Sequence, residues 1–153
     1  MTEDLRALDD WLAPLLAGIT PTARRRLARD LARDLRRQQQ QRIAAQLNPD
    51  GTRYEARKAT LRDRKGKIRR GAMFAKIRTA THLRVEASPD QASVGFAGRV
   101  ARIASVHQLG LRDRVRPDGP EVQYAARRLL GLTTEDREWI RDRILHVLAS
   151  YAP

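Results

Sequence analysis

Cysteine is absent from this chain of 153 residues, and aromatic residues make up only 5% of it. A chain without cysteine forms no disulfide and has no catalytic thiolate or cysteine-ligated metal. Because aromatics are scarce, leucine, isoleucine, valine and alanine have to build the core. No stretch approaches the roughly 20 consecutive apolar residues of a membrane-spanning helix. The sequence therefore excludes disulfide-stapled, thiol-dependent and helical membrane proteins as classes.

Sequence signals for targeting and for common cofactor sites are also missing. The opening residues MTEDLRALDD are acidic and lack the pattern of a signal peptide, so we expect the protein to be made and used in a cytosol. His82, His107 and His146 lie far apart in the sequence, without the close pairing that holds a metal. Phosphate-loop, dinucleotide, zinc-protease and serine-hydrolase motifs are absent. None of these patterns marks a candidate site for a cofactor or a metal.

Positive charge is what the sequence has in excess. The chain has 31 basic and 18 acidic residues, which give a formal net charge of +13. Most of this charge lies in residues 21–46, with a net +6, and in residues 53–78, with a net +9. Such runs are typical of nucleic-acid binding, of an arm for an acidic protein surface, or of a solvated face. Tyr54 is the one aromatic residue in residues 52–71, which disfavours a stacking platform for single strands.

Two helices are predicted in the N-terminal part. Leucines at three- and four-residue spacing predict a helix over residues 3–17. Thr20 followed by Pro21 is a start signal for a second helix over residues 21–46. We expect the two helices to form a hairpin that packs on another subunit or assembly component, because the apolar stripe of the second is narrow. That stripe consists of Leu27, Leu31 and Leu35.

The segment after these helices is predicted to be a loop. The sequence Asn48-Pro49-Asp50-Gly51 is a turn signal, and residues 52–71 have little apolar content. We interpret residues 48–71 as a mobile basic loop that becomes ordered on binding. Its candidate contacts for a polyanion or an acidic partner are Arg57, Lys58, Arg62, Arg64, Lys65, Lys67, Arg69 and Arg70.

The remainder of the chain mixes helix and strand signals. In chain order, the patterns predict a short helix near residues 73–77, strands over 81–87 and 92–96, a helix over 99–109, a loop over 111–120, a short strand over 121–125, a connector over 127–132 and a last helix over 134–148. The predicted fold class is α+β, with an N-terminal helical hairpin followed by a small antiparallel sheet packed with two or three helices. The predicted domains are residues 1–47, the loop 48–71 and an α+β body over 72–153.

Candidates for catalysis are few. Asp30 and Asp34 lie one helical turn apart among arginines, which favours charge balancing over a paired-carboxylate site. His107 lies on the last turn of a predicted helix, where a cation suits the helix dipole. It is either a contact residue or pH-sensitive group at an interface, or a structural residue that bonds a free carbonyl. Local helix chemistry favours the structural role.

Two short motifs resemble those of a known family. Residues 98–110, GRVARIASVHQLG, resemble the A-x-I-H-Q-x-G segment of the phage virion morphogenesis family, although Ala104-Ser105-Val106 precedes the His-Gln pair. Residues 124–133, YAARRLLGLT, resemble its Y-P-x-R-x-x-L-G-L-S segment, with Ala125 where the family often has proline. The leucine helix, the arginine-rich helix and the turn after them resemble the tail completion proteins of that family in order and spacing. The motif positions are His107, Gln108, Gly110, Arg127, Leu130 and Gly131.

The resemblance implies a structural protein of contractile-tailed phages and prophages. Such proteins complete or cap the head-proximal end of the tail tube and permit head–tail joining. The resemblance also implies a ring, a hexamer if it follows the symmetry of the tail, with the tail tube protein and head–tail connector proteins as partners. DNA would pass through the lumen of the ring. The implied location is the virion tail, after assembly in the bacterial host cytoplasm. The resemblance implies no enzyme activity, no metal, no cofactor, no membrane and no small-molecule substrate.

Two alternatives stay open. A sequence-independent nucleic-acid-binding module would use the basic residues 53–78 and would bind with a steep salt dependence. An enzyme such as a nuclease would need a cluster of carboxylates at a metal, and the sequence shows no such cluster.

Overall fold

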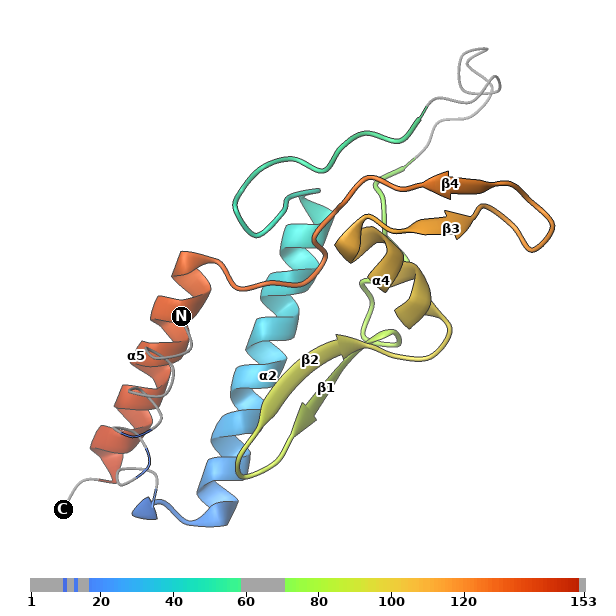
Figure 1. Cartoon of the computed structure of the whole chain (residues 1–153). Helices are drawn as coiled ribbons and strands as arrows, with labels where there is room; N and C mark the ends of the chain where they lie inside the picture. The colour runs from blue at the N-terminus through green and yellow to red at the C-terminus, as the bar shows by residue number, and fades with distance from the viewer. Residues whose placement is uncertain (1–9, 11–12, 14–16, 59–70, 152–153) are drawn as a thin grey trace. The chain divides into compact units, whose positions relative to one another are not determined.

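The computed structural model describes residues 10, 13, 17–58 and 71–151. The elements in chain order are α2 (Pro21–Ala44), β1 (Leu83–Ala87), β2 (Ala92–Phe96), α4 (Val100–Leu109), β3 (Arg112–Arg114), β4 (Glu121–Gln123) and α5 (Thr134–Ser150) (Figure 1). β1 pairs with β2 and β3 pairs with β4, in two separate two-stranded sheets. The predicted α+β class is confirmed. Among the described residues, no helix is both long and apolar enough to cross a membrane.

The chain divides into two compact units that alternate along the sequence. One unit consists of Met1–Leu35, Val85–Val94 and Thr134–Pro153, and the other of Arg36–Arg84 and Gly95–Thr133. All six motif positions fall in the second, which we call the motif unit. The predicted division into residues 1–47, 48–71 and 72–153 concerns separate contact surfaces and stays a prediction.

The second predicted helix is confirmed as α2. The Ala23 N–H donates to Thr20 Oγ1 at 3.2 Å, so Thr20 is the expected N-cap. Leu27 is buried, whereas Leu31 and Leu35 are half-buried, so the described monomer covers the leucine stripe only in part. The first predicted helix, residues 3–17, lies outside the described residues except at three positions.

The paired strands at residues 81–87 and 92–96 are also confirmed. β1 and β2 run in opposite directions, and the Ser88 N–H donates to the Gln91 carbonyl at 2.8 Å to close the turn (Figure 1). Leu83 is fully buried and Val85 half-buried, whereas Arg84 and Glu86 are exposed, as their alternation predicts.

The core of the motif unit comes from segments far apart in the sequence. Its buried cluster is Ile43, Tyr54, Ala104 and Leu129, and the partly buried side chains packed against it are Met73, Phe74, Ile77 and Phe96. Tyr54 and Leu129 come from segments predicted to be a mobile loop and a connector. Tyr54 is buried and its N–H donates to the Gln46 carbonyl at 2.8 Å, whereas the mobility of the basic loop stays a prediction.

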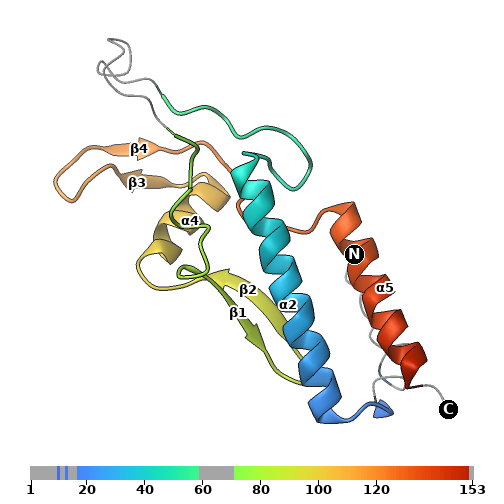
Figure 2. The ribbon, with the colours of Figure 1, turned by 180° about the vertical axis from the view of Figure 1, so that it is seen from behind.

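Two predictions for short segments were wrong. Residues 73–77 form a turn instead of a short helix, because Phe74 has a φ of 64° and so leaves the right-handed helical region. Residues 111–120 are not all loop, because β3 pairs antiparallel with β4 through Asp113 opposite Val122. β3 is Arg-Asp-Arg, which has no apolar face to signal a strand. β3 and β4 lie beside α4 in both views (Figure 1, Figure 2).

Candidate functional site

The two sequence motifs meet in the motif unit through the side chain of Gln108. Its Oε1 accepts the Leu130 N–H at 2.9 Å, and its Nε2 donates to the Leu130 carbonyl at 2.9 Å. Both amide atoms are thereby paired with the same backbone residue. This double hydrogen bond fixes the segment before α5 against the end of α4.

Arg127 makes a second connection between the motifs. Its backbone N–H donates to the His107 carbonyl at 2.7 Å. Its guanidinium donates to the carbonyls of Glu55 at 2.8 Å and Ala56 at 3.2 Å, and Nη1 lies 3.3 Å from His107 Nδ1. Arg127 is only 6% exposed, and burial lowers its pKa. A buried guanidinium that donates to backbone carbonyls joins three chain segments.

His107 belongs to a row of ring side chains. The ring centroids of Tyr54 and Phe74 are 5.8 Å apart, those of Phe74 and His107 are 4.9 Å apart, and those of His107 and Tyr124 are 5.0 Å apart, all edge to face. Burial and then the nearby charges of Arg127 and Arg57 hold the pKa of His107 below its usual value. Burial likewise raises the pKa of Tyr54 to about 12.

The choice between a structural role and an interface role for His107 stays a prediction, and the structure adds what its ring contacts. The ring contacts Phe74, Tyr124 and Arg127, and the lowered pKa favours the neutral form over a cation at the C-terminus of α4. The helix is instead capped by Gly110, whose φ of 64° lets its N–H donate to the Val106 carbonyl.

The two motif glycines allow close contacts between segments. A Cβ on Gly110 would lie 3.0 Å from the Ala126 nitrogen, and one on Gly131 would lie 2.5 Å from Pro49 Cγ. Leu130 is half-buried and supplies the backbone groups that Gln108 binds. The structure thus brings all six motif positions together, and their described contacts hold the motif unit together.

Several polar residues of this network were missed by sequence analysis. Arg42 Nη2 donates to the carbonyls of Leu129 at 3.1 Å and Gly131 at 3.3 Å, and the Gly131 N–H donates to Gln39 Oε1 at 3.3 Å. Gln46 pairs both amide atoms with the backbone of Met73. The sequence did show these polar residues clustered at the end of an amphipathic helix. The same pattern is found for residues that face solvent, so it did not identify them as part of the network.

The basic candidate residues are only partly described. Arg57 and Lys58 are exposed, and Arg57 Nη1 donates to the Gly71 carbonyl at 3.4 Å. The other six candidates lie outside the described residues: Arg62, Arg64, Lys65, Lys67, Arg69 and Arg70. In the part of the chain that the structure describes, no three His, Asp or Glu residues gather as they would to hold a metal.

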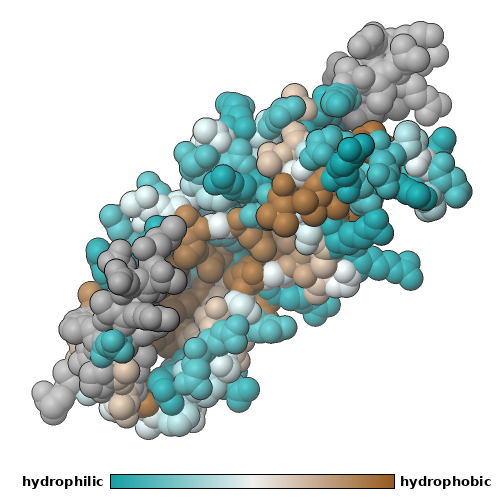
Figure 3. All heavy atoms as spheres, viewed as in Figure 1, coloured by the Kyte–Doolittle hydropathy of each residue, from teal (hydrophilic) through white to brown (hydrophobic). Residues whose placement is uncertain are grey.

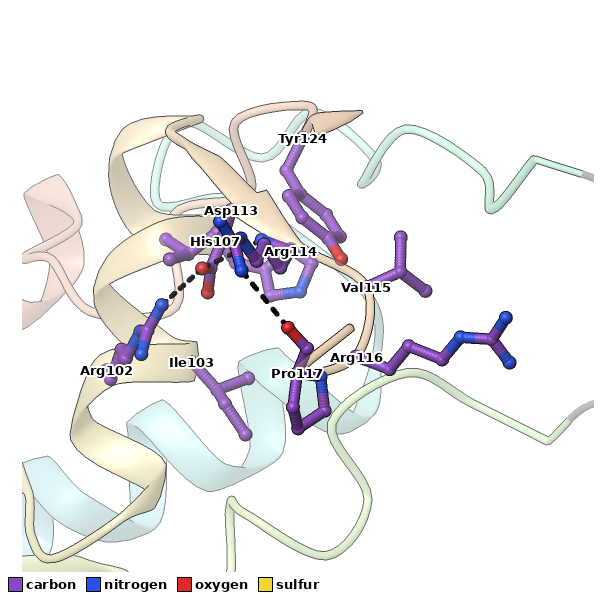
Figure 4. A pocket seen from close by; sticks show the side chains of 10 residues that line it. Arg102, Ile103, His107, Asp113, Arg114, Val115, Arg116, Pro117 and Tyr124 are labelled. Atoms are coloured by element: carbon purple, nitrogen blue, oxygen red, sulfur yellow. Dashed lines mark hydrogen bonds and ion pairs between the residues drawn. The ribbon is translucent and has the colours of Figure 1, made fainter. Parts of the chain in front are cut away.

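The motif unit also has an open cleft of about 710 Å³ between α4 and the β3–β4 hairpin, which we call the hairpin cleft (Figure 4). Ile103 on α4 and Val115 next to β3 line it, and they are 49% and 60% exposed. Arg102 and Asp113 form an ion pair at its edge. The Arg114 backbone N–H and then Arg102 lower the pKa of Asp113.

Comparisons with known proteins match this chain over nearly its whole length. The pattern of the phage virion morphogenesis family matches residues 3–149. Tail completion protein S of Escherichia phage P2 is 44% identical over 144 residues, which are 93% of this chain and 95% of that protein. No solved structure matches the chain. Because the family match covers nearly the whole chain, including both motifs, the chain belongs to the phage virion morphogenesis family.

Proposed function

We propose that this chain is a structural protein of a phage tail. It completes or caps the head-proximal end of the tail tube and permits the head to join. The family match and the 44% identity to a tail completion protein support this role. Its place is the virion tail, after assembly in the bacterial host cytoplasm.

The observation that carries the structural role is what the motif side chains do. Gln108 and Arg127 place their polar groups on backbone atoms of other segments, and Gly131 lies against Pro49. Groups used in this way position chain segments and do not act on a substrate. We therefore propose a role without catalysis.

The proposed assembly is a closed ring, a hexamer if it follows the symmetry of the tail. Cyclic closure suits a protein that ends a tube. Its partners are the tail tube protein and head–tail connector proteins, and DNA passes through its lumen. The basic residues of the loop 48–71 face that DNA or an acidic neighbour, because clustered lysine and arginine neutralise phosphates and carboxylates. The helical hairpin 1–47 and the body 72–153 supply separate contact surfaces.

Deleting the coding sequence from the phage or prophage that carries it tests this role. We expect unjoined heads and tails in electron micrographs, and addition of the purified protein to the lysate should restore joined particles. A Gln41→Met protein, altered at an exposed glutamine of α2, is the matched control and should restore joining fully. Normal infectious particles without the protein would overturn the proposal.

A second candidate function is sequence-independent nucleic-acid binding by residues 53–78. The exposed cations Arg57 and Lys58 at the start of the basic run favour it. Fluorescence anisotropy with a labelled duplex of random sequence, measured over a series of salt concentrations, tests it. A steep salt slope that falls on Arg57→Gln/Lys58→Gln substitution supports this function. Binding that is insensitive to both changes would exclude these residues from the contact.

A further inference from the structure

The hairpin cleft is a surface that the described network leaves uncovered. Ile103 and Val115 expose aliphatic side chains on its two sides, and Leu111, at the start of the hairpin, is 42% exposed. β3 and β4 have three residues each, and a two-stranded hairpin of this size is marginal in water by itself. Apolar side chains from a partner would cover the cleft and stabilise the hairpin. Hydrophobic residues show among hydrophilic ones on the face in Figure 3.

The positive charge at the edge of the cleft favours a partner with acidic side chains. Arg102, Arg114 and Arg116 line it, with Asp113 as the one acidic lining residue among those described. Asp113 is already paired with Arg102, and Arg114 Nε lies 3.9 Å from Glu121 Oε1. The Arg116 side chain extends away from the hairpin in Figure 4, without an ion pair to any residue that the structure describes. The cleft therefore fits a segment that combines carboxylates with aliphatic side chains.

The lining of the cleft favours a protein segment over nucleic acid. A base needs the open face of an aromatic ring on which to stack. The ring residues here, His107 and Tyr124, lie edge to face against each other with centroids 5.0 Å apart. The exposed walls come from Ile103, Val115 and Pro117, which suit leucine side chains (Figure 4).

One segment of the chain itself has the required chemistry. Residues 3–12 contain four carboxylates and three leucines against a single arginine, in a protein whose net charge is +13. Two copies of so basic a chain repel each other unless an acidic segment mediates the contact. We propose that residues 3–12 of a second copy of this chain bind in the hairpin cleft. The inference rests on the proposed ring and names its contact, because a contact between two different surfaces repeats around a ring.

The absence of native cysteine makes a direct test available. Two single-cysteine variants of the full chain, Leu8→Cys and Val115→Cys, are mixed and oxidised with copper phenanthroline. The expected result is a disulfide-linked dimer in which each chain carries one variant, identified by mass spectrometry. Leu132→Cys, at an aliphatic position 42% exposed in the same unit but outside the cleft, replaces Val115→Cys as the matched control.

Each outcome decides the proposal. Cross-linking of Leu8→Cys to Val115→Cys at least fivefold above that to Leu132→Cys supports it, as does its loss on adding Arg114→Glu/Arg116→Glu. Equal cross-linking to both sites, or none, overturns it. A double variant, Leu8→Cys/Val115→Cys, that cross-links within one chain and not between chains also overturns it. If a DNA duplex protects the introduced thiol of the Val115→Cys variant from alkylation and the cross-link is absent, the proposal is overturned in favour of nucleic acid. If the cross-link fails but the protein still restores joined phage particles, the proposed tail role stands and the contact between subunits lies on another surface.

Discussion

At the scale of single residues, two motif side chains, Gln108 and Arg127, bind backbone groups of other segments. The Gln108 amide forms hydrogen bonds with both the N–H and the carbonyl of Leu130, and the Arg127 guanidinium donates to the carbonyls of Glu55 and Ala56. A backbone group buried without a partner costs about 1–3 kcal/mol. These positions therefore require a long polar side chain, because neither a shorter nor an apolar residue forms the same hydrogen bonds.

Substitution of Gln108 tests this role. Gln108→Met keeps the length of the side chain but leaves the Leu130 N–H and carbonyl without these partners. We expect the free energy of unfolding in urea to fall by about 1–3 kcal/mol. Gln41→Met, at an exposed position of α2, should change it by less than about 0.5 kcal/mol. Equal effects of the two substitutions would contradict the assigned role.

His107 makes stability depend on pH. Its pKa is lowered from 6.5 in the folded chain, first by burial and then by Arg127 and Arg57. Between the folded and unfolded pKa values the unfolded chain binds more protons, so stability rises with pH in that window. The stabilisation is fully present above 6.5 and is lost as the pH falls from there toward the folded pKa.

Urea unfolding at about pH 7.5 and about pH 5 measures this dependence. We expect the loss of stability between the two to be smaller in His107→Gln than in the unaltered protein. His146→Gln, at an exposed position of α5, is the control and should keep the full loss. An unchanged loss in His107→Gln would show that another group carries the pH dependence.

At the scale of elements, glycine sets how closely segments approach. Gly131 lies against Pro49, where an added Cβ would be 2.5 Å from Cγ, and Gly110 lies against Ala126. These contacts fix the turn after α2 and the end of α4 against the segment that leads to α5. The segment has no regular structure, yet Leu129 within it is fully buried.

Alanine at these glycines tests the close approach. Gly131→Ala should destabilise the protein by about 1–3 kcal/mol through overpacking against the proline ring. Gly110→Ala adds a strained left-handed backbone, at a cost of about 1–2 kcal/mol. Gly95→Ala, with no atom within 4 Å of the added Cβ, is the matched control and should not destabilise. Thermal unfolding compares the stability of the three variants with that of the unaltered protein. Unchanged stability of Gly131→Ala would refute the close contact between Gly131 and Pro49.

At the scale of the whole molecule, the proposed ring predicts a mass. Light scattering of the purified protein without nucleic acid should give about six chains. If the contact joins acidic residues to the hairpin cleft, high salt should lower the mass by screening it. Arg114→Glu/Arg116→Glu should lower the mass at low salt, whereas Arg141→Glu on α5 should not. A monomer under all conditions would contradict self-assembly without a tail template.

The sequence by itself determined the elements whose signals are local. The Thr20 cap, the Gly110 stop and the alternation of β1 depend on neighbours a few residues away, and the structure has all three. The two motifs were likewise visible in the sequence, and they indicated the family. The structural role of Gln108 and Arg127 was not, because their partners are 22 and more than 70 residues away.

Only the tertiary structure decided which polar and irregular segments are core. Tyr54 and Leu129 lie in stretches whose composition predicts loops, and they are buried because distant segments cover them. β3 exists because β4 pairs with it, although its own three residues favour no strand. The hairpin cleft follows from that pairing. Local chemistry thus fixes where helices and strands begin and end, whereas burial and long-range pairing fix what the residues between them do.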